Sequence, residues 1–349
     1  MTREPLRFGI LGAARIAPMA LVAPARRVPE TSIVAIAARD PERARRFATR
    51  HGIARVHDSY EALLGDPDVE AVYVPLPNAL HCRWTIRALE AGKHVLCEKP
   101  FAATAAEAEE MAAAAKRTDR VLVEAFHYRY HPLFARLQAI LAAGDVGDVR
   151  HVEAHLCFPL PFRSDIRYSA ELAGGALMDA GCYPVHFLRH LVGAEPEVME
   201  AHAEWTRGGV DRCMEARLRF PGGVTARLTC SLFSAWVVRA SAIVQGSGGR
   251  MTVLNPFVPQ LYHRLRVVNA AGTRVERVAG PATYDCQLRA FVSAVRDRTS
   301  VPTTPEDAIR NMRTIEAIYA AAGRQRVSSR QPAIGPPPAA TSATSQSGT

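Results

Sequence analysis

Lys99 is the first side chain in this sequence with an evident chemical use. It follows the apolar run HVLC at 94–97 and stands between Glu98 and Pro100. A desolvated lysine can release its proton, or remain a compact cation that lowers the pKa of a neighbouring acid. The alternative is a solvated ion pair with Glu98. We therefore take Lys99 as a candidate catalytic residue, and a cis bond before Pro100 as a way to aim it inward.

A second group of reactive side chains lies in the segment 171–193, ELAGGALMDAGCYPVHFLRHLVG. Tyr183 follows Asp179 by four residues and His186 follows three residues later, so an uninterrupted helix would place all three on one face. Gly181 and Pro184 predict a kinked or late-starting helix. An acid, a phenol and an imidazole together indicate proton transfer. The alternatives are a capping aspartate and a tyrosine buried in a domain interface.

The sequence gives only a weak indication of a metal site. His186 and His190 are one helical turn apart and could ligate an ion, but the sequence offers no further ligand cluster, so we expect no metal. The seven cysteines form no C-x-x-C pair and leave an odd one, which favours reduced thiols and a cytoplasmic protein.

A phosphate-binding turn is predicted after the first strand. FGILGAARIA places Gly12, Ala14 and Ala17 where a dinucleotide fingerprint has three glycines. Gly12 suits the tight turn, and we expect the amides of Ala13, Ala14, Arg15 and Ile16 at a helix start to face a phosphate. A plain strand-to-helix turn is the alternative.

The choice of cofactor depends on the end of the second strand, where NAD enzymes place an acid and NADP enzymes a cation. Here Ala38 fills the acid position, and Arg39, helped by Arg43, is free to meet a 2'-phosphate. Asp40 precedes Pro41 and is better suited to capping a helix. We therefore expect NADP, with NAD as the alternative.

The elements that hold these residues alternate between strand and helix up to about residue 125. Parallel strands joined by right-handed crossovers follow from this order, which is a Rossmann-type doubly wound α/β sheet. Ligands in such a sheet lie at the carboxyl ends of the strands. The runs expected as strands are 7–11, 32–38, 70–77, 93–100 and 120–126.

After residue 130 the pattern changes to a helix followed by alternating runs separated by turns. This pattern indicates an α+β domain with a large, mostly antiparallel open sheet. We expect a dinucleotide-binding domain at 1–128, a substrate-binding and oligomerisation domain at 129–330, and a disordered tail rich in Pro, Ser and Thr at 331–349.

Three stretches resemble the signature blocks of the Gfo/Idh/MocA oxidoreductases. They are GILGAARIAP, VPLPNALHCRWTIRALEAGKHVLCEKP and GGALMDAGCYPVH, and the resemblance covers roughly residues 5–327. The alanine-rich turn and the tyrosine four residues after the aspartate are similar to the branch with glucose-fructose oxidoreductase, dimeric dihydrodiol dehydrogenase and NADP-dependent D-xylose dehydrogenase. A histidine replaces that tyrosine in the inositol dehydrogenase branch, so inositol is a less favoured substrate.

The resemblance implies site residues. By this resemblance Lys99, Asp179 and Tyr183 match the catalytic positions of the family, and the protein is expected to form a homodimer or homotetramer. The implied cofactor contacts besides the turn and Lys99 are Leu76, Pro77, Asn78, His81 and Glu98, with Arg129 in a stretch similar to the domain hinge. His81 could instead cap the helix that begins there. Arg163 and Arg167, in a segment expected to line the substrate wall, are candidate substrate contacts, as is His186.

The predicted function is hydride transfer between nicotinamide C4 and a hydroxyl-bearing carbon of a sugar, polyol or cyclic diol. Tyr183 would be the acid/base, with Lys99 stabilising its phenolate and Asp179 orienting Lys99 or the substrate. The alternatives are an NAD-using glycoside hydrolase and a nucleotide-sensing regulator on the same fold. The net charge of +9 comes from arginines scattered among acids, so nucleic acid is not an expected partner, and neither is a membrane.

Overall fold

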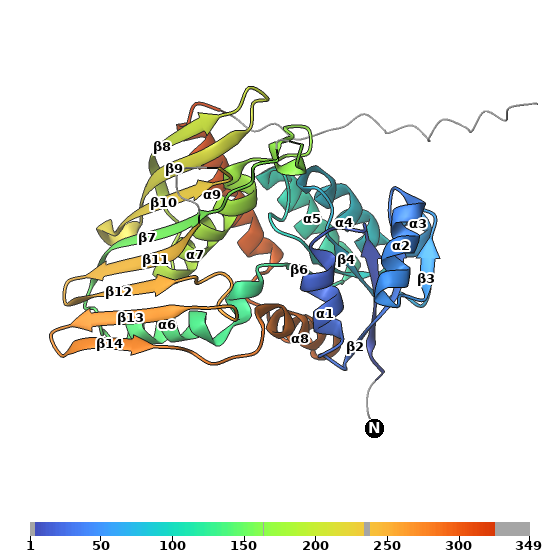
Figure 1. The fold of residues 1–349 in the computed structure, drawn as a ribbon, viewed down its shortest axis with the longest axis horizontal. Coiled ribbons are helices and arrows are strands. Elements are labelled where there is room, and N and C mark those ends of the chain that lie inside the picture. Colours follow the sequence, from blue (N-terminus) through green and yellow to red (C-terminus); the bar gives the residue numbers. More distant parts are fainter. Residues whose placement is uncertain (1–3, 163, 234–237, 325–349) are drawn as a thin grey trace, which may run out of the picture.

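Six parallel strands form the first sheet of this computed structural model, which describes residues 4–162, 164–233 and 238–324 (Figure 1). The strands are ordered β3-β2-β1-β4-β5-β6, so the chain reverses its direction of winding between β1 and β4. This order confirms the predicted doubly wound sheet. The short strand β3 was missed, because its three residues are only half-buried. The bounds are β1 Leu6–Leu11, β2 Thr31–Ala37, β3 Arg55–His57, β4 Ala71–Val74, β5 His94–Cys97 and β6 Leu122–Glu124.

The helices between these strands begin at the predicted caps. The Asp40 carboxylate accepts hydrogen bonds from the N–H groups of Glu42 and Arg43 at 3.0 and 3.1 Å. The Thr104 hydroxyl accepts from the Glu107 N–H at 3.2 Å. Such caps satisfy N–H groups that the helix itself leaves free. The helices are the π-helical turn η1 Pro18–Val22, α1 Ala23–Ala25, α2 Pro41–His51, α3 Tyr60–Leu64, η2 Asn78–Leu80, α4 His81–Glu90 and α5 Ala105–Thr118.

Eight strands form the second sheet, in the order β14-β13-β12-β11-β7-β10-β9-β8. All neighbouring pairs in it are antiparallel except β7 and β10, which confirms the mostly antiparallel open sheet. The bounds are β7 Val149–Cys157, β8 Glu197–Trp205, β9 Asp211–Arg219, β10 Thr225–Ser231, β11 Arg239–Gly246, β12 Gly249–Leu254, β13 Arg264–Asn269 and β14 Gly272–Glu276.

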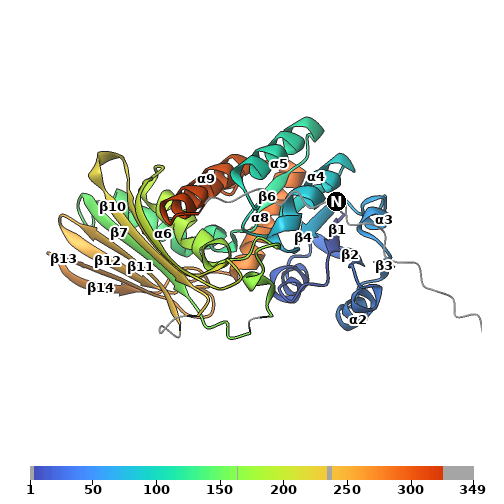
Figure 2. The ribbon, with the colours of Figure 1, turned by 90° about the horizontal axis from the view of Figure 1, so that it is seen from above.

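Helices cover the side of the second sheet that faces the first sheet. Helices α6 and α9 lie on the side of the second sheet that faces the first (Figure 2), and α7 packs against β7 and β10. The remaining elements are η3 His127–Tyr130, α6 Pro132–Ala142, η4 Ile166–Tyr168, η5 Leu177–Gly181, α7 Cys182–Val192, η6 Pro221–Gly223, α8 Thr283–Asp297 and α9 Pro305–Ala321.

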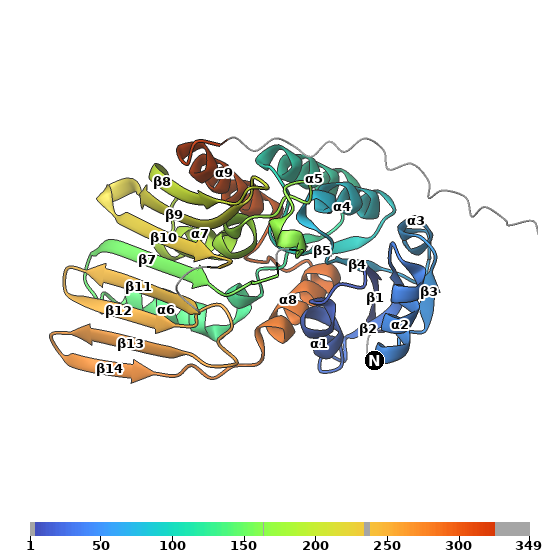
Figure 3. The same ribbon diagram turned by 45° about the horizontal axis from the view of Figure 1, so that its top comes forward.

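Helix α8 returns to the first sheet after the second sheet is complete, and lies beside α1 (Figure 3). Its Phe291 ring centre lies 5.6 Å from that of Phe8 on β1, and Leu288 joins the same buried core. The first sheet therefore takes part of its cover from residues late in the chain. The division into domains at 128/129 stays a prediction.

Two predictions fall outside the described residues: the substrate contact Arg163 and the disordered tail at 331–349. Among the helices that are described, none combines the length and apolar character needed to cross a bilayer.

Candidate functional site

The turn after β1 leaves room for a ligand at the point where the sheet reverses. Gly12 has φ +108°, and a Cβ on it would lie 3.0 Å from Leu76 Cδ2, so a larger residue would be strained and would crowd the loop after β4. The π-helical turn η1 begins at Pro18, a residue that suits the first position of a helix. Residues 13–16 form the loop and turn that lead directly into it, and the Ile16 carbonyl oxygen accepts from the Ala20 N–H at 2.9 Å. That their amides face a phosphate stays a prediction.

A cavity of about 280 Å³ opens beside this turn, between the two sheets. It is lined by segments that lie far apart in the chain: the β1 turn, the loops after β4 and β5, the segment around η4, and η5 with the start of α7. Predicted site residues in its lining are Ala14, Arg15, Ile16, Leu76, Pro77, Asn78, Glu98, Lys99, Arg167, Asp179 and Tyr183.

The Lys99 side chain extends from the end of β5 to Asp179 in η5. Its peptide bond to Pro100 is cis, as the sequence suggested. The ammonium donates to the Asp179 carbonyl oxygen at 2.9 Å and to Asp179 Oδ1 at 3.2 Å. Burial is the largest single influence and lowers the pKa of Lys99, but Asp179, Cys182 and Glu98 together outweigh it and leave that pKa raised. Lys99 is therefore a fixed cation, and Glu98 instead accepts a hydrogen bond from the Tyr73 hydroxyl at 2.6 Å.

Asp179 lies between two cations. Its Oδ2 accepts from Arg167 Nε at 2.6 Å while Oδ1 faces Lys99. Burial would raise the pKa of Asp179, yet Lys99 and Arg167 hold it below its usual value. Arg167 also pairs with Asp165 at 3.2 Å, and Asp165 in turn bonds Arg15 on the β1 turn. A chain of alternating charges thus links the turn to the catalytic candidates.

Tyr183 is held by a histidine that the sequence analysis missed. Its hydroxyl lies 3.2 Å from His127 Nε2, and His127 Nδ1 lies 2.8 Å from the Thr283 hydroxyl. Burial lowers the pKa of His127 to about 3 and raises the pKa of Tyr183 well above 10. Because His127 follows the carboxyl end of β6, its position in a parallel sheet was an available signal.

The Lys99 ammonium lies beside the ring of Tyr183. Its Nζ lies 5.1 Å from the centre of that ring, while its hydrogen bonds go to Asp179. Burial is the largest influence on the pKa of Tyr183 and raises it, and the stabilisation of a Tyr183 phenolate by Lys99 stays a prediction.

Apart from Gly12, Ala13, Ala38 and Arg39, three predicted site residues of the described chain lie outside the cavity lining. His81 is fully buried, with its ring nitrogens 2.8 Å from the carbonyl oxygens of Leu76 and Pro100, so it ties together two loops that border the cavity. The Arg129 guanidinium packs 4.1 Å from the centre of the Phe134 ring. These two residues therefore support the site without lining it.

His186, the third, does not contact the substrate space. Its ring centre lies 4.2 Å from that of Phe126, and its Nδ1 lies 2.6 Å from the Tyr128 hydroxyl. The segment that precedes it is the π-helical turn η5, in which i→i+5 spacing replaces the α-helical spacing assumed from the sequence. Regular α-helix resumes at Cys182, so the expected kink is present.

A basic hollow continues from the cavity and shares Ala14 and Arg15 with it. Arg43, Arg46 and Arg50 of α2 line this hollow together with Ala13. Ala38 is buried at the end of β2, but Arg39 is exposed and lines neither hollow. Arg43 is therefore a candidate for a 2'-phosphate, since it lines the basic hollow, and the contact expected from Arg39 stays a prediction.

The residues present fit a nicotinamide dinucleotide. The open turn at Gly12 suits a pyrophosphate, the arginines of the basic hollow suit further phosphate charge, and the cavity with Lys99 and Tyr183 suits the reactive end. The cavity and the basic hollow share the lining residues Ala14 and Arg15, which follow Gly12 in the turn.

Comparisons with known proteins match both halves of the chain. The family model for the oxidoreductase family GFO/IDH/MocA, NAD-binding Rossmann fold, matches residues 6–126, and that for the GFO/IDH/MocA C-terminal domain matches residues 134–252. D-xylose 1-dehydrogenase (NADP(+)) 2 of Haloferax volcanii is 37% identical over 320 residues, which cover 91% of this chain and 97% of that protein.

Two solved structures superpose on most of the chain. One is a 3-ketoreductase from Actinomadura kijaniata in complex with NADP and TDP-benzene, with a TM-score of 0.86, 33% identity, and coverage of 91% of this chain and 98% of the other. The second is an aldose-aldose oxidoreductase from Caulobacter crescentus complexed with glycerol, with a TM-score of 0.85, 29% identity, and coverage of 92% and 99%.

Proposed function

The chain belongs to the GFO/IDH/MocA family of oxidoreductases, and from this premise we propose that it interconverts an alcohol and a ketone or aldehyde on a sugar or polyol with NADP(H). The cofactor supplies or accepts the hydride. The observation that carries the proposal is the meeting of Lys99, Asp179 and Tyr183 in one cavity that continues into the basic hollow.

Tyr183 serves as the acid in the reducing direction. Its buried, neutral phenol can donate its proton to a substrate oxygen as that oxygen gains charge. The nearby Lys99 ammonium stabilises the charge that develops, and Asp179 holds this ammonium in place through two hydrogen bonds. In the oxidising direction the phenolate must form first, which favours operation at higher pH.

Carbohydrate substrates fit the polar groups around this acid. Arg167 lines the cavity and keeps its guanidinium beside Asp179, and Asn78 anchors the opposite rim by donating to the Ala173 carbonyl oxygen at 2.9 Å. Hydroxyl-rich ligands are recognised by such charged and amide groups. The xylose, ketosugar and aldose enzymes among the relatives support the same substrate class.

NADP is the proposed cofactor rather than NAD. The support is the row of arginines on α2 beside the turn, in place of an acid at the end of β2. The xylose dehydrogenase and the ketoreductase, which are described with NADP, agree with this choice.

The decisive experiment is an assay of the purified full chain. NADP and NAD reduction would be followed against sugars, polyols and cyclic diols, and NADPH oxidation against aldoses and ketosugars. We expect NADP-dependent turnover with at least one carbohydrate. Release of sugar from glycosides without net change in nicotinamide absorbance would point to the glycoside hydrolase, and nucleotide binding without turnover to the regulator.

We also propose a homodimer or homotetramer in the cytoplasm. The face of the second sheet that turns away from α6 and α9 is available for a second copy (Figure 2), and all seven cysteines are free thiols, as suits a reducing compartment. Light scattering on the purified chain tests the assembly, since a monomer mass would contradict it.

A further inference from the structure

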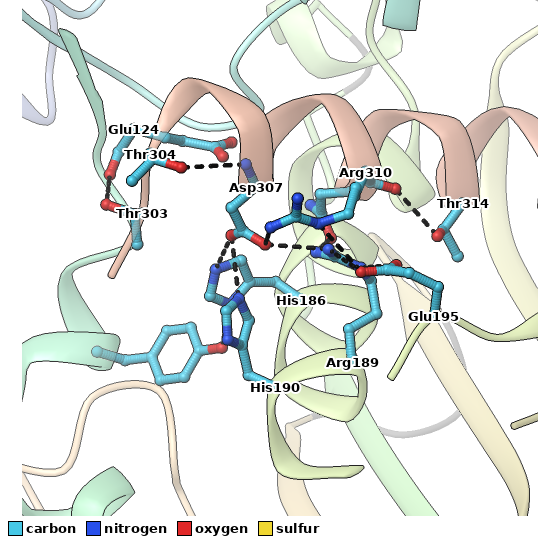
Figure 4. Close-up of polar contacts among 12 residues, drawn as sticks. Glu124, His186, Arg189, His190, Glu195, Thr303, Thr304, Asp307, Arg310 and Thr314 are labelled. Carbon is cyan, nitrogen blue, oxygen red and sulfur yellow. Dashed lines mark hydrogen bonds and ion pairs between the residues drawn. The ribbon is translucent and has the colours of Figure 1, made fainter. Parts of the chain in front are cut away.

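Two histidines of α7 and an aspartate of α9 converge away from the cavity (Figure 4). His186 and His190 are one turn apart, and Asp307 lies in the first turn of α9. The Nε2 atom of each histidine lies 3.0 Å from the same carboxylate oxygen, Asp307 Oδ2. All three atoms lie within 4.8 Å of one another. Three potential metal ligands therefore point at one small volume.

The three facing atoms are buried and lack well-directed hydrogen bonds. Among the described residues, neither Nε2 atom nor Asp307 Oδ2 has a hydrogen bond of good geometry, although each nitrogen lies 3.0 Å from that oxygen. The side chains of His186 and Asp307 are 0% and 4% exposed. Buried polar atoms without partners are costly, and those that persist call for a function.

Two of the three separations match those of atoms bound to one ion, and the separation between the two histidine nitrogens is no more than 4.8 Å. Zinc lies about 2.0 to 2.1 Å from nitrogen and oxygen ligands, so neighbouring ligand atoms in a tetrahedral or octahedral shell are about 2.9 to 3.4 Å apart. The two separations of 3.0 Å fall in this range. Two imidazoles with one carboxylate form a ligand set that suits zinc and similar divalent transition metals.

Neighbouring groups hold each ligand in place. The second nitrogen of His186 lies 2.6 Å from the Tyr128 hydroxyl, as a metal-ligating histidine usually has a partner for its other ring nitrogen. Asp307 Oδ1 accepts from Arg189 at 3.0 Å, which leaves Oδ2 for an ion. Arg189 and Arg310 both pair with Glu195. Before any ion is bound, Asp307 and Glu195 together offset the charges of the two arginines.

We propose that His186, His190 and Asp307 bind one divalent transition-metal ion of the zinc class. The His190 side chain is 20% exposed, which provides a route of entry and a direction for a water as fourth ligand. The ion would join α7 to α9, and α7 carries Tyr183 at its start. The role follows from this placement: the ion stabilises the helix that positions the candidate acid, without touching the substrate.

The test uses the full chain, freed of any affinity tag and treated with chelator. Titration with Zn²⁺ by calorimetry should give one site per chain, and Co²⁺ should give the visible absorption of a bound ion. His190→Ala should weaken Zn²⁺ binding by more than about a hundredfold, since loss of a mere supporting partner already costs ten- to hundredfold. His202→Ala is the matched control, because His202 is an exposed histidine on β8.

The outcomes separate a metal site from an ion pair. Binding that is lost in His190→Ala and kept in His202→Ala supports the proposal, and Zn²⁺ should then raise the melting temperature of the wild type but not of His190→Ala. Absence of a stoichiometric site in the wild type, or equal binding by both variants, would overturn it. The Co²⁺ spectrum of the wild type decides the question even if His190→Ala does not fold.

Discussion

Replacing Tyr183 by phenylalanine isolates the chemical role of one hydroxyl. In the folded chain this hydroxyl has a hydrogen bond of 3.2 Å to His127 Nε2. Losing such a bond costs about 1 kcal/mol of folding free energy, and leaving a buried partner unpaired costs about 1 to 3 kcal/mol. A protein that is stable by about 5 to 15 kcal/mol remains folded after either loss. The variant should therefore keep its structure and its affinity for NADPH.

The turnover of Tyr183→Phe should fall by a much larger factor than its stability or its NADPH affinity. A positioned acid or base contributes about a hundred- to ten-thousandfold in rate, which corresponds to about 2.7 to 5.4 kcal/mol of activation free energy at 1.36 kcal/mol per tenfold. A purely structural tyrosine would change turnover only through the folded fraction, which the stability estimate leaves near one. The size of the kinetic effect therefore distinguishes the two roles.

Tyr130→Phe provides the matched control, because the Tyr130 hydroxyl is also engaged, 2.6 Å from the Thr303 hydroxyl, but lies outside the cavity lining. The assay combines kcat at saturating NADPH with the substrate found by screening, NADPH binding by fluorescence, and melting temperature. We expect Tyr130→Phe to lose stability but keep its turnover. Turnover of Tyr183→Phe within threefold of wild type, or an equal fall in both variants, would refute the reasoning.

Three further predictions follow from charged and titratable groups. Lys99→Met should cut turnover about a hundredfold with NADPH affinity within a few-fold of wild type; retained turnover in steady-state assays would remove Lys99 from the mechanism. Arg43→Ala should raise the KM for NADPH about ten- to a hundredfold without changing that for NADH, since Arg43 lines the basic hollow. Arg45→Ala, which removes the pairs with Glu42 and Asp58 outside this hollow, should leave both KM values unchanged; equal effects of Arg43→Ala on both cofactors would argue against a 2'-phosphate site. Burial lowers the pKa of His94 from 6.5 to about 4, so the unfolded chain binds a proton that the folded chain does not, and stability should fall as pH drops from 6.5 towards 4. Urea unfolding should show His94→Asn losing about 1 kcal/mol less than wild type between pH 7 and pH 5, and an identical loss would contradict the assignment.

Local sequence patterns were sufficient to predict the first half of the fold. Alternating apolar runs, the cap at Asp40 and the Thr104 to Glu107 pair each act within a few residues, so the strand and helix order of the first sheet could be predicted from sequence. The strand β3 escaped because it is short and half-buried. The return of α8 to the first sheet could not be predicted, since it depends on contacts such as Phe8 with Phe291, nearly the whole chain apart.

The candidate site shows the same division between local and distant causes. Lys99 and Asp179 were identified from their places in motifs, and their carboxylate to ammonium contact agrees with that prediction. His127 was missed because its role comes from burial next to Tyr183, which raises the pKa of one group and lowers that of the other, and burial is a property of the assembled fold.

The segment 177–192 shows why spacing alone misplaced His186. Asp179 and Tyr183 both line the cavity although the π-helical turn η5 lies between them, and Tyr183 and His186 are both in the regular helix α7. Tyr183 at the start of α7 still lines the cavity, whereas His186 points to Asp307 of α9. The third ligand lies more than a hundred residues later in the chain, so the sequence pattern of His186 and His190 could indicate a metal pair but not complete it. A single helix thus contributes to the cavity at its beginning and to a separate polar cluster along its length.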